Sequence, residues 1–306
     1  MEHVVLPVLT PAAAGAVTAL ASQGGIAVVA VAIDVGQGGA LDALRVLALD
    51  AGAAKCHAVD ARDTLAERAC WPALAAGALE PAGEPIHTAL TMPVVASTVF
   101  DIARLEGLGA AAPWAEDAGD RRRLRALLRD LAPSLGLVST AGGTDRAITR
   151  NAWAEVTPAP DGPLPDARPP ASGAVTLRIG FAHGLPVSVN GVAATPLETV
   201  DSLATIAHDL GAWTVRDPDA PRAWRVRAPA AALLARAAAA LAARVLDPTT
   251  AAVAALAGEQ YAGVVRDGAW FRPVREGLDA FVARVLRDAT GEVTMHLDGG
   301  RIEVEA

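Results

Sequence analysis

Several residue types that carry common chemistry are scarce in this 306-residue sequence. Lys55 is the only lysine, so a Schiff base, a Walker-type lysine or a lysine phosphate clamp would depend on this one position. The two cysteines, Cys56 and Cys70, are too few for a disulfide framework or a paired metal motif. They indicate a reducing environment, and we therefore expect a cytoplasmic protein.

Motifs for nucleotides and metals are also missing. The sequence contains no G-x-x-x-x-G-K-[ST] loop, and no G-x-G-x-x-G follows a predicted strand. Its six histidines form no H-E-x-x-H pattern, so we expect neither a bound metal nor a cofactor. With 34 acidic and 26 basic residues the net charge is −8, which provides no field to attract a polyanion. Nucleic acid is therefore not an expected partner.

The stretch from Val4 to Ile33 carries no charge and is long enough to cross a bilayer as a helix. However, Pro7 and Pro11 interrupt it, and no basic residues precede it as they would in a signal peptide. Two buried strands around a helix of small residues, with the second strand ending at Asp34, fit the pattern better. We therefore predict a βαβ unit with a parallel sheet and no membrane partner.

The alternation of strands and helices continues to about residue 150. The pattern predicts further strands at Lys55–Val59 and Leu135–Ser139, and helices at Leu41–Asp50, Arg62–Ala76, Met92–Leu105 and Arg121–Leu131. We interpret residues 1–150 as an open, doubly wound α/β domain. Ligands of such domains bind at the carboxyl ends of the strands.

A second domain follows a connector rich in proline, residues 151–170. For residues 171–306 the pattern predicts an α+β domain. Its predicted elements are a hairpin of Ala174–Phe181 with Pro186–Val189, helices at Pro196–Leu210, Ala228–Arg244, Thr249–Val265 and Arg275–Ala289, and a closing hairpin over Glu292–Val304.

Few residues indicate chemistry by themselves. His87 stands in a loop at the mouth of the predicted α/β domain, where it is either a functional group or a solvated loop histidine. The segment Gly36–Gly39 follows a predicted strand, where it could contact an anion or simply connect two elements. Cys70, beside Trp71, is typical of core packing rather than of a nucleophile.

Longer motifs resemble argininosuccinate synthase. They begin with Asp34-Val35-Gly36-Gln37-Gly38 and the helix that follows, continue through Asp60-Ala61-Arg62-Asp63, Trp71-Pro72 and Thr88-Ala89-Leu90, and end with Gln260-Tyr261-Ala262, Asp267-Gly268, Trp270-Phe271 and Leu278-Asp279-Ala280-Phe281. Most of the chain is covered, although it is shorter than the family between Ser139 and Arg146. The resemblance implies an α/β domain of the adenine nucleotide hydrolase type, followed by a synthetase and oligomerisation domain.

The same resemblance implies that the ATP site is degenerate. In the family a loop S-G-G-L-D-T-S holds the ATP pyrophosphate while the citrulline ureido oxygen is activated for attack by aspartate. The matching positions, Leu9 to Gly15, share none of these residues, and Pro11 has no N–H to donate. Other ligand positions of the family also carry different residues here, namely Glu84, Met92, Ala147, Val156, Arg227 and Ala235, and between positions 117 and 125 only Asp120 and Arg123 are kept.

Three functions remain open at this point. The chain is a repurposed relative that binds or transforms a different small molecule without ATP, in specialised metabolism; or a noncatalytic scaffold or partner subunit; or an ATP-dependent argininosuccinate synthase. For the first function the expected substrate-binding set is Glu84, His87, Thr88, Asp120, Arg123 and Arg227. Two arginines at this site, Arg123 and Arg227, favour an anionic ligand, and His87 with Glu84 would exchange a proton near neutral pH.

The C-terminal motif also bears on assembly. Aromatic residues make up only 4% of the chain, yet Gln260–Phe281 contains Tyr261, Trp270, Phe271 and Phe281. Aromatic side chains are enriched at subunit interfaces, although they also pack inside single subunits. We expect a homotetramer, as the family resemblance implies.

Overall fold

The computed structural model describes residues 2–79, 86–115, 118–140, 150–158, 175–207, 212–216, 223–298 and 301–305. The chain forms two compact units. Unit 1 contains residues 1–65, 88–151 and 264–272, and unit 2 contains residues 66–87, 152–263 and 273–306.

A five-stranded parallel sheet forms the centre of unit 1, as the sequence predicted. Its strands are β1 (Glu2–Val8), β2 (Ile26–Asp34), β3 (Lys55–Asp60), β4 (Ala110–Ala111) and β5 (Gly136–Leu137), in the order β3-β2-β1-β4-β5. The central strands β1 and β2 are almost continuously apolar because both faces of the sheet are covered. Lys55 begins the edge strand β3 and is exposed, as is common on sheet edges.

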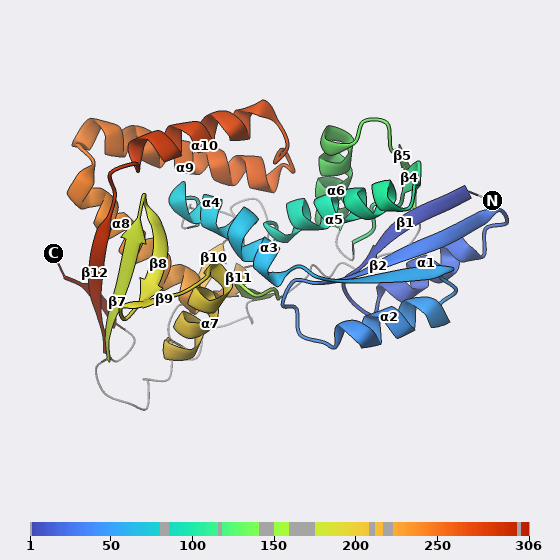
Figure 1. The fold of residues 1–306 in the computed structure, drawn as a ribbon, viewed down its shortest axis with the longest axis horizontal. Helices are drawn as coiled ribbons and strands as arrows, with labels where there is room; N and C mark the ends of the chain where they lie inside the picture. Colours follow the sequence, from blue (N-terminus) through green and yellow to red (C-terminus); the bar gives the residue numbers. More distant parts are fainter. Residues whose placement is uncertain are drawn as a thin grey trace. The chain divides into compact units, whose positions relative to one another are not determined.

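Helices cover both faces of this sheet (Figure 1). On one face, α1 (Ala13–Ala21) and α2 (Leu41–Asp50) pack against Val4, Leu6 and Val28. The intervening residues Val5 and Val29 point to the opposite face, since successive side chains of a strand alternate. That face is covered by α5 (Thr91–Leu105), against which α6 (Ala118–Leu131) packs.

Unit 2 begins with a helical segment that interrupts the α/β alternation. The predicted helix Arg62–Ala76 is a run of three pieces: α3 (Arg62–Leu65) in unit 1, then a π-helical turn, Ala66–Cys70, and α4 (Trp71–Ala75) in unit 2. Cys70 is fully buried, which agrees with core packing, and burial raises the pKa of its thiol.

Two antiparallel sheets lie in unit 2. The larger has the order β13-β12-β7-β8-β9 and the smaller the order β10-β11-β6. Their strands are β6 (Glu155–Pro158), β7 (Val175–Ala182), β8 (Leu185–Val189), β9 (Val192–Ala193), β10 (Ala212–Arg216), β11 (Ala223–Arg227), β12 (Gly291–Asp298) and β13 (Arg301–Val304). Alternate residues of β7 and β12 are buried, the pattern of a sheet with one face toward the core.

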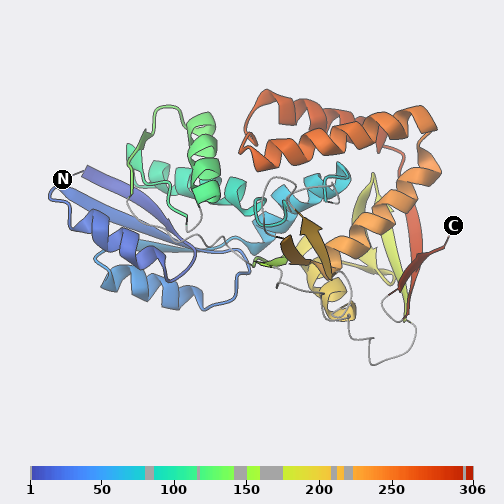
Figure 2. The ribbon, with the colours of Figure 1, turned by 180° about the vertical axis from the view of Figure 1, so that it is seen from behind.

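Four helices complete unit 2: α7 (Pro196–Ile206), α8 (Pro229–Val245), α9 (Pro248–Arg266), whose last turn belongs to unit 1, and α10 (Pro273–Val285). The helix α7 begins with a capping box, in which Thr195 and Glu198 each accept from the other's backbone N–H. In both views α9 and α10 run side by side, and α8 lies against the strand β12 (Figure 2). Within the described part of the chain, no helix is both long and apolar enough to cross a membrane.

Candidate functional site

Polar side chains collect at the carboxyl edge of the parallel sheet in unit 1. Asp34 ends β2 and Asp60 ends β3, while Leu9 and Thr10 follow β1. Because all strands of this sheet are parallel, their carboxyl ends lie along one edge. The strand order reverses between β1 and β4, and this reversal is the usual ligand position of a doubly wound fold.

Gln37 joins the two central strand ends to each other. Its side-chain amide nitrogen donates to the carbonyl oxygens of Leu9 (2.9 Å) and Ile33 (2.8 Å). Its amide oxygen accepts the backbone N–H of Val35 at 2.7 Å. The neighbouring N–H of Gly36 donates to Asp34 Oδ1 at 2.8 Å. The polar groups of this loop therefore bond to one another and to the β1 end.

Two backbone N–H groups of the turn between β1 and α1 also donate within the chain. The N–H groups of Ala13 and Ala14 donate to the carbonyl oxygens of Thr10 (3.1 Å) and Pro11 (3.2 Å). Pro11 has no N–H, and the N-cap residue Ala12 has no side chain that could bind a ligand or cap the helix. A helix N-terminus normally offers such N–H groups to anions, and two of them are already engaged here.

Asp60 and Arg62 form an ion pair at the end of β3. The guanidinium donates to both carboxylate oxygens, from Nε to Oδ1 at 2.9 Å and from Nη2 to Oδ2 at 2.6 Å. These hydrogen bonds hold the pKa of Asp60 below its usual range. The same guanidinium lies 3.8 Å from the carboxylate of Asp34, and 45% of the Arg62 side chain stays exposed. The guanidinium of Arg62 is thus a cation that a ligand can reach at this edge.

A buried polar contact and a further cation lie at residues 150 and 151, where the second stretch of unit 1 ends. Asn151 donates from Nδ2 to Thr91 Oγ1 at 3.0 Å, and both residues are buried. Next to it Arg150 is exposed, and a Cβ added to Gly38 would lie 3.9 Å from its Nη1. The backbone of Gly38 has φ +79°, a conformation that favours glycine. Arg150 therefore stands beside the β2–α2 loop.

Asp120 and Arg123, two of the residues expected to bind substrate, contact each other. Arg123 Nη1 donates to Asp120 Oδ1 at 2.8 Å, and Asp120 is 2% exposed. Arg123 Nε donates to the carbonyl oxygen of Arg266 at 2.7 Å. A Cβ on Gly268, whose φ is +67°, would lie 2.9 Å from the Arg123 carbonyl oxygen. This close packing binds α6 to the segment 264–272 of unit 1.

His87 is buried, not solvated. It is 1% exposed, and Trp153 Nε1 donates to its Nδ1 at 3.1 Å. The rings of Trp153 and Trp71 meet edge to face with centroids 6.0 Å apart. Burial lowers the pKa of His87 to about 4, so the ring is neutral at pH 7. Burial therefore opposes the proton exchange near neutral pH that the sequence suggested for His87, because a charged imidazole is unfavourable in this environment.

The remaining expected site residues do not form one described group. Thr88 is half-buried in unit 1, and its carbonyl accepts the N–H of Thr91 at 3.0 Å. Arg227 ends β11 in unit 2, paired with Glu155 of β6 in the sheet register. Glu84 lies outside the described residues. Asp120 and Arg123 are in direct contact with each other.

The comparisons with known proteins agree with this fold. Residues 12–158 match a family model described as "Arginosuccinate synthase N-terminal HUP domain", and residues 166–306 match "Arginosuccinate synthase C-terminal domain". The chain belongs to the argininosuccinate synthase family. A relative from Pelotomaculum thermopropionicum, described as argininosuccinate synthase, is 29% identical over 321 residues, which cover 90% of this chain and 80% of that protein.

Family membership explains which features of the edge are kept. Asp34, Gly36, Gln37 and Asp60 all stand in motifs that carry the family resemblance, and all four help to order the strand ends. The β1–α1 turn shares no residue with the pyrophosphate loop that the resemblance places there. Sequence reasoning missed the side-chain bonds of Gln37 and Arg62, although both residues follow strand ends closely.

Proposed function

We propose that this member of the argininosuccinate synthase family does not carry out ATP-dependent ligation, and that it binds or transforms a different small molecule without ATP. The observation that supports this proposal is that backbone N–H groups at the carboxyl edge are already hydrogen-bonded within the chain. The N–H groups of Ala13, Ala14, Val35 and Gly36 already donate to acceptors of the chain itself.

Binding a pyrophosphate in this turn would carry a large cost. Each charge-assisted hydrogen bond to a phosphate oxygen contributes about 1.5–3 kcal/mol, and a triphosphate needs several of them. Here the chain would have to break internal bonds of Ala13 and Ala14 to supply donors, and Pro11 supplies none. The one lysine, Lys55, is exposed at the start of β3 and pairs with Glu106. It begins the strand whose other end reaches the carboxyl edge.

An anionic or amino-acid-like ligand is the class we favour for this edge. Arg62 and Arg150 are accessible cations there, and guanidinium groups bind carboxylates with two parallel hydrogen bonds. The carboxylates of Asp34 and Asp60 beside them could bind an ammonium group. A ligand that carries both charges, as amino acids do, matches this arrangement.

Two other functions stay in competition. The name of the Pelotomaculum relative supports an ATP-dependent argininosuccinate synthase, and the family comparisons fit that function about as well as the proposed one. A noncatalytic scaffold or partner subunit is the other. The composition of the β1–α1 turn argues against an ATP-dependent synthase. The accessible cations favour a ligand-binding protein over a scaffold.

Calorimetry with MgATP separates these functions. We expect no heat of binding up to millimolar MgATP and no pyrophosphate release in the presence of citrulline and aspartate. The Pelotomaculum relative serves as the positive control. Micromolar affinity for MgATP, or pyrophosphate release that needs both amino acids, would contradict the proposal and assign the ligase reaction to this chain.

A second titration tests the ligand class, with L-aspartate and citrulline as probes. We expect Arg150→Ala to weaken binding of whichever probe binds, since Arg150 supplies an accessible cation at the edge. Arg129→Ala is the matched control, because Arg129 is an exposed residue of α6. Equal loss in both variants, or none in either, would argue against binding at this edge.

We further propose that the chain assembles as a homotetramer through its second domain. Tyr261 and Trp270 are buried within the chain, but Phe271 and Phe281 are only half-buried. Leu256 on α9 and Val274 on α10 are more than half exposed, which leaves apolar surface for an interface. Light scattering at micromolar concentration is expected to give the tetramer mass. A monomer would contradict this assembly.

A further inference from the structure

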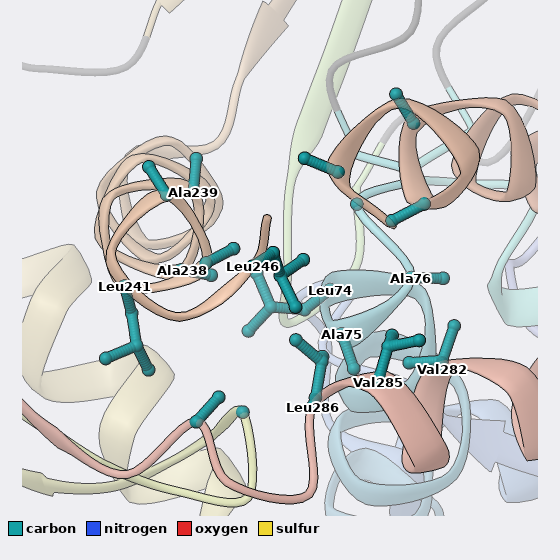
Figure 3. A pocket seen from close by; sticks show the side chains of 18 of the residues that line it. Leu74, Ala75, Ala76, Ala238, Ala239, Leu241, Leu246, Val282, Val285 and Leu286 are labelled. Atoms are coloured by element: carbon teal, nitrogen blue, oxygen red, sulfur yellow. The ribbon is translucent and has the colours of Figure 1, made fainter. Parts of the chain in front are cut away.

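A cavity of about 360 Å³ lies within unit 2, between its helices. It is lined by the end of α4 and the turn after it, by one face each of α8, α9 and α10, and by the β7–β8 turn. All twenty lining residues are alanine, glycine, leucine or valine. Figure 3 shows Ala238 and Leu241 of α8, Ala75 of α4 and Val285 of α10 around the common space.

Two glycines let the chain segments around the cavity approach one another closely. A Cβ on Gly258 of α9 would lie 2.6 Å from the carbonyl oxygen of Ala76, so α9 already touches the turn after α4. A Cβ on Gly184 would lie 2.7 Å from Leu286, just beyond the end of α10. Neighbouring chain segments therefore already touch at these two points beside the cavity, while the space between the helices stays open.

The lining determines which ligands can enter. No lining side chain carries a charge, a hydroxyl or an amide. An ion would lose its hydration without gaining a partner, and a strongly polar molecule would leave hydrogen bonds unmade. A cavity of about 150 Å³ with apolar walls is enough to bind benzene, and small-molecule sites begin at about 300 Å³. This cavity is larger than both, which favours a ligand with an aliphatic chain.

We propose that this cavity binds an uncharged aliphatic small molecule, with any polar end directed to its opening. The lining residues are all in unit 2, whereas the carboxyl edge described above is in unit 1. The inference therefore goes beyond the proposed function and does not depend on it. The driving force is burial of the aliphatic chain against the alanine, leucine and valine walls.

The primary alcohol 1-octanol is a suitable probe, and 1,8-octanediol is its matched comparison. Both have the same chain length, but the diol must place a second hydroxyl group against walls that offer no side-chain partner. Calorimetry is expected to detect saturable binding of 1-octanol at one site per chain and weaker binding of the diol. Binding is also expected to raise the thermal unfolding midpoint, because it favours the folded state.

Filling the cavity is the decisive variant. Ala238→Leu combined with Ala242→Leu adds two side chains, one helical turn apart, on the face of α8 that lines the cavity. We expect more than about tenfold weaker binding of 1-octanol in this variant. Ala252→Leu is the control, because Ala252 is an exposed residue of α9 outside the lining. Its affinity for 1-octanol is expected to match that of the wild type.

Three outcomes would overturn the proposal. The first is the absence of saturable 1-octanol binding to the folded wild type, and the second is equal binding of alcohol and diol. The third is unchanged binding in the filled variant. If that variant does not fold, Ala242→Leu alone provides the same comparison. A change of oligomer mass in a filled variant, with no octanol binding to the wild type, would assign the cavity to a second copy of the chain and reject the ligand.

Discussion

The carboxyl edge of the parallel sheet in unit 1 and the cavity in unit 2 differ in how the chain fills them. At the edge, polar groups are paired with one another, as Gln37 with Leu9 and Ile33, and Arg62 with Asp60. The cavity has no polar side chain in its lining, and a space of about 360 Å³ remains. The polar groups of the edge are thus already hydrogen-bonded within the chain, whereas the cavity is a space lined by apolar side chains.

The two regions therefore differ in how a ligand could gain free energy of binding. A ligand at the edge must either use the accessible guanidinium groups or displace bonds that the chain already makes. A ligand in the cavity displaces nothing but water and gains apolar contact. Family ancestry directs attention to the edge, because doubly wound folds bind ligands there. The structure adds a second position that the ancestry does not indicate.

The largest expected effect concerns the buried pair Asp120 and Arg123. We predict that Asp120→Ala lowers the free energy of unfolding by about 3–5 kcal/mol, because it leaves the Arg123 guanidinium largely buried without its carboxylate partner. Urea denaturation measures this loss. Asp60→Asn is the control for an exposed pair, with an expected loss of about 1 kcal/mol or less. Equal losses in the two variants would show that burial does not distinguish the pairs.

A second prediction concerns His87, the buried ring of unit 2. Its folded pKa of about 4 lies below the ordinary value of 6.5, so the unfolded chain takes up the proton first as the pH falls. The stability contributed by the neutral ring is complete above pH 6.5 and is lost between pH 6.5 and pH 4. From the pKa difference we expect a loss of about 3 kcal/mol over this range.

Chemical denaturation at pH 7 and pH 4 checks this pH dependence. His87→Gln keeps a hydrogen-bond acceptor for Trp153 but does not titrate, so it is expected to lose less stability than the wild type on acidification. His3→Gln, at an exposed position of β1, should behave as the wild type does. If all three proteins lose the same stability, the His87 ring does not control the pH dependence.

Much of the fold was predictable because the long elements have strong hydrophobic patterns. The uncharged run from Val4 predicted β1, α1 and β2, and the hairpins of unit 2 follow the alternation of apolar residues. Short strands were missed. β4 consists only of Ala110 and Ala111. Two alanines in an alanine-rich chain give no hydrophobic alternation from which a strand could be predicted. The predicted helix to Ala289 ends earlier, at Val285, where Leu286 packs against Gly184.

The site was less predictable than the fold because its bonds depend on tertiary contacts. Family motifs pointed to Asp120 and Arg123, but only the structure places the carbonyl of Arg266 against Arg123. The neighbours of His87 in the sequence are typical of a loop, whereas in the structure the ring is buried and accepts a hydrogen bond from Trp153, 66 positions away. A proline-rich neighbourhood indicates a loop and carries no information about burial.

The smallest expected effect concerns Gln37, which orders the edge. Gln37→Ala removes three hydrogen bonds at once and leaves the carbonyl oxygens of Leu9 and Ile33 and the N–H of Val35 without this partner. The loop is only partly buried, so water replaces some of the lost bonds, and we expect about 1–2 kcal/mol of lost stability. Thermal unfolding measures this loss, with Gln23→Ala, in the exposed turn after α1, as the control.

The same variant also tests the nucleotide site. If phosphate binding is prevented by the lack of free backbone donors in the β1–α1 turn, Gln37→Ala will still bind no MgATP, because Pro11 and the alanines of that turn are unchanged. Micromolar MgATP affinity in this variant alone would instead show that Gln37 closes a competent nucleotide site.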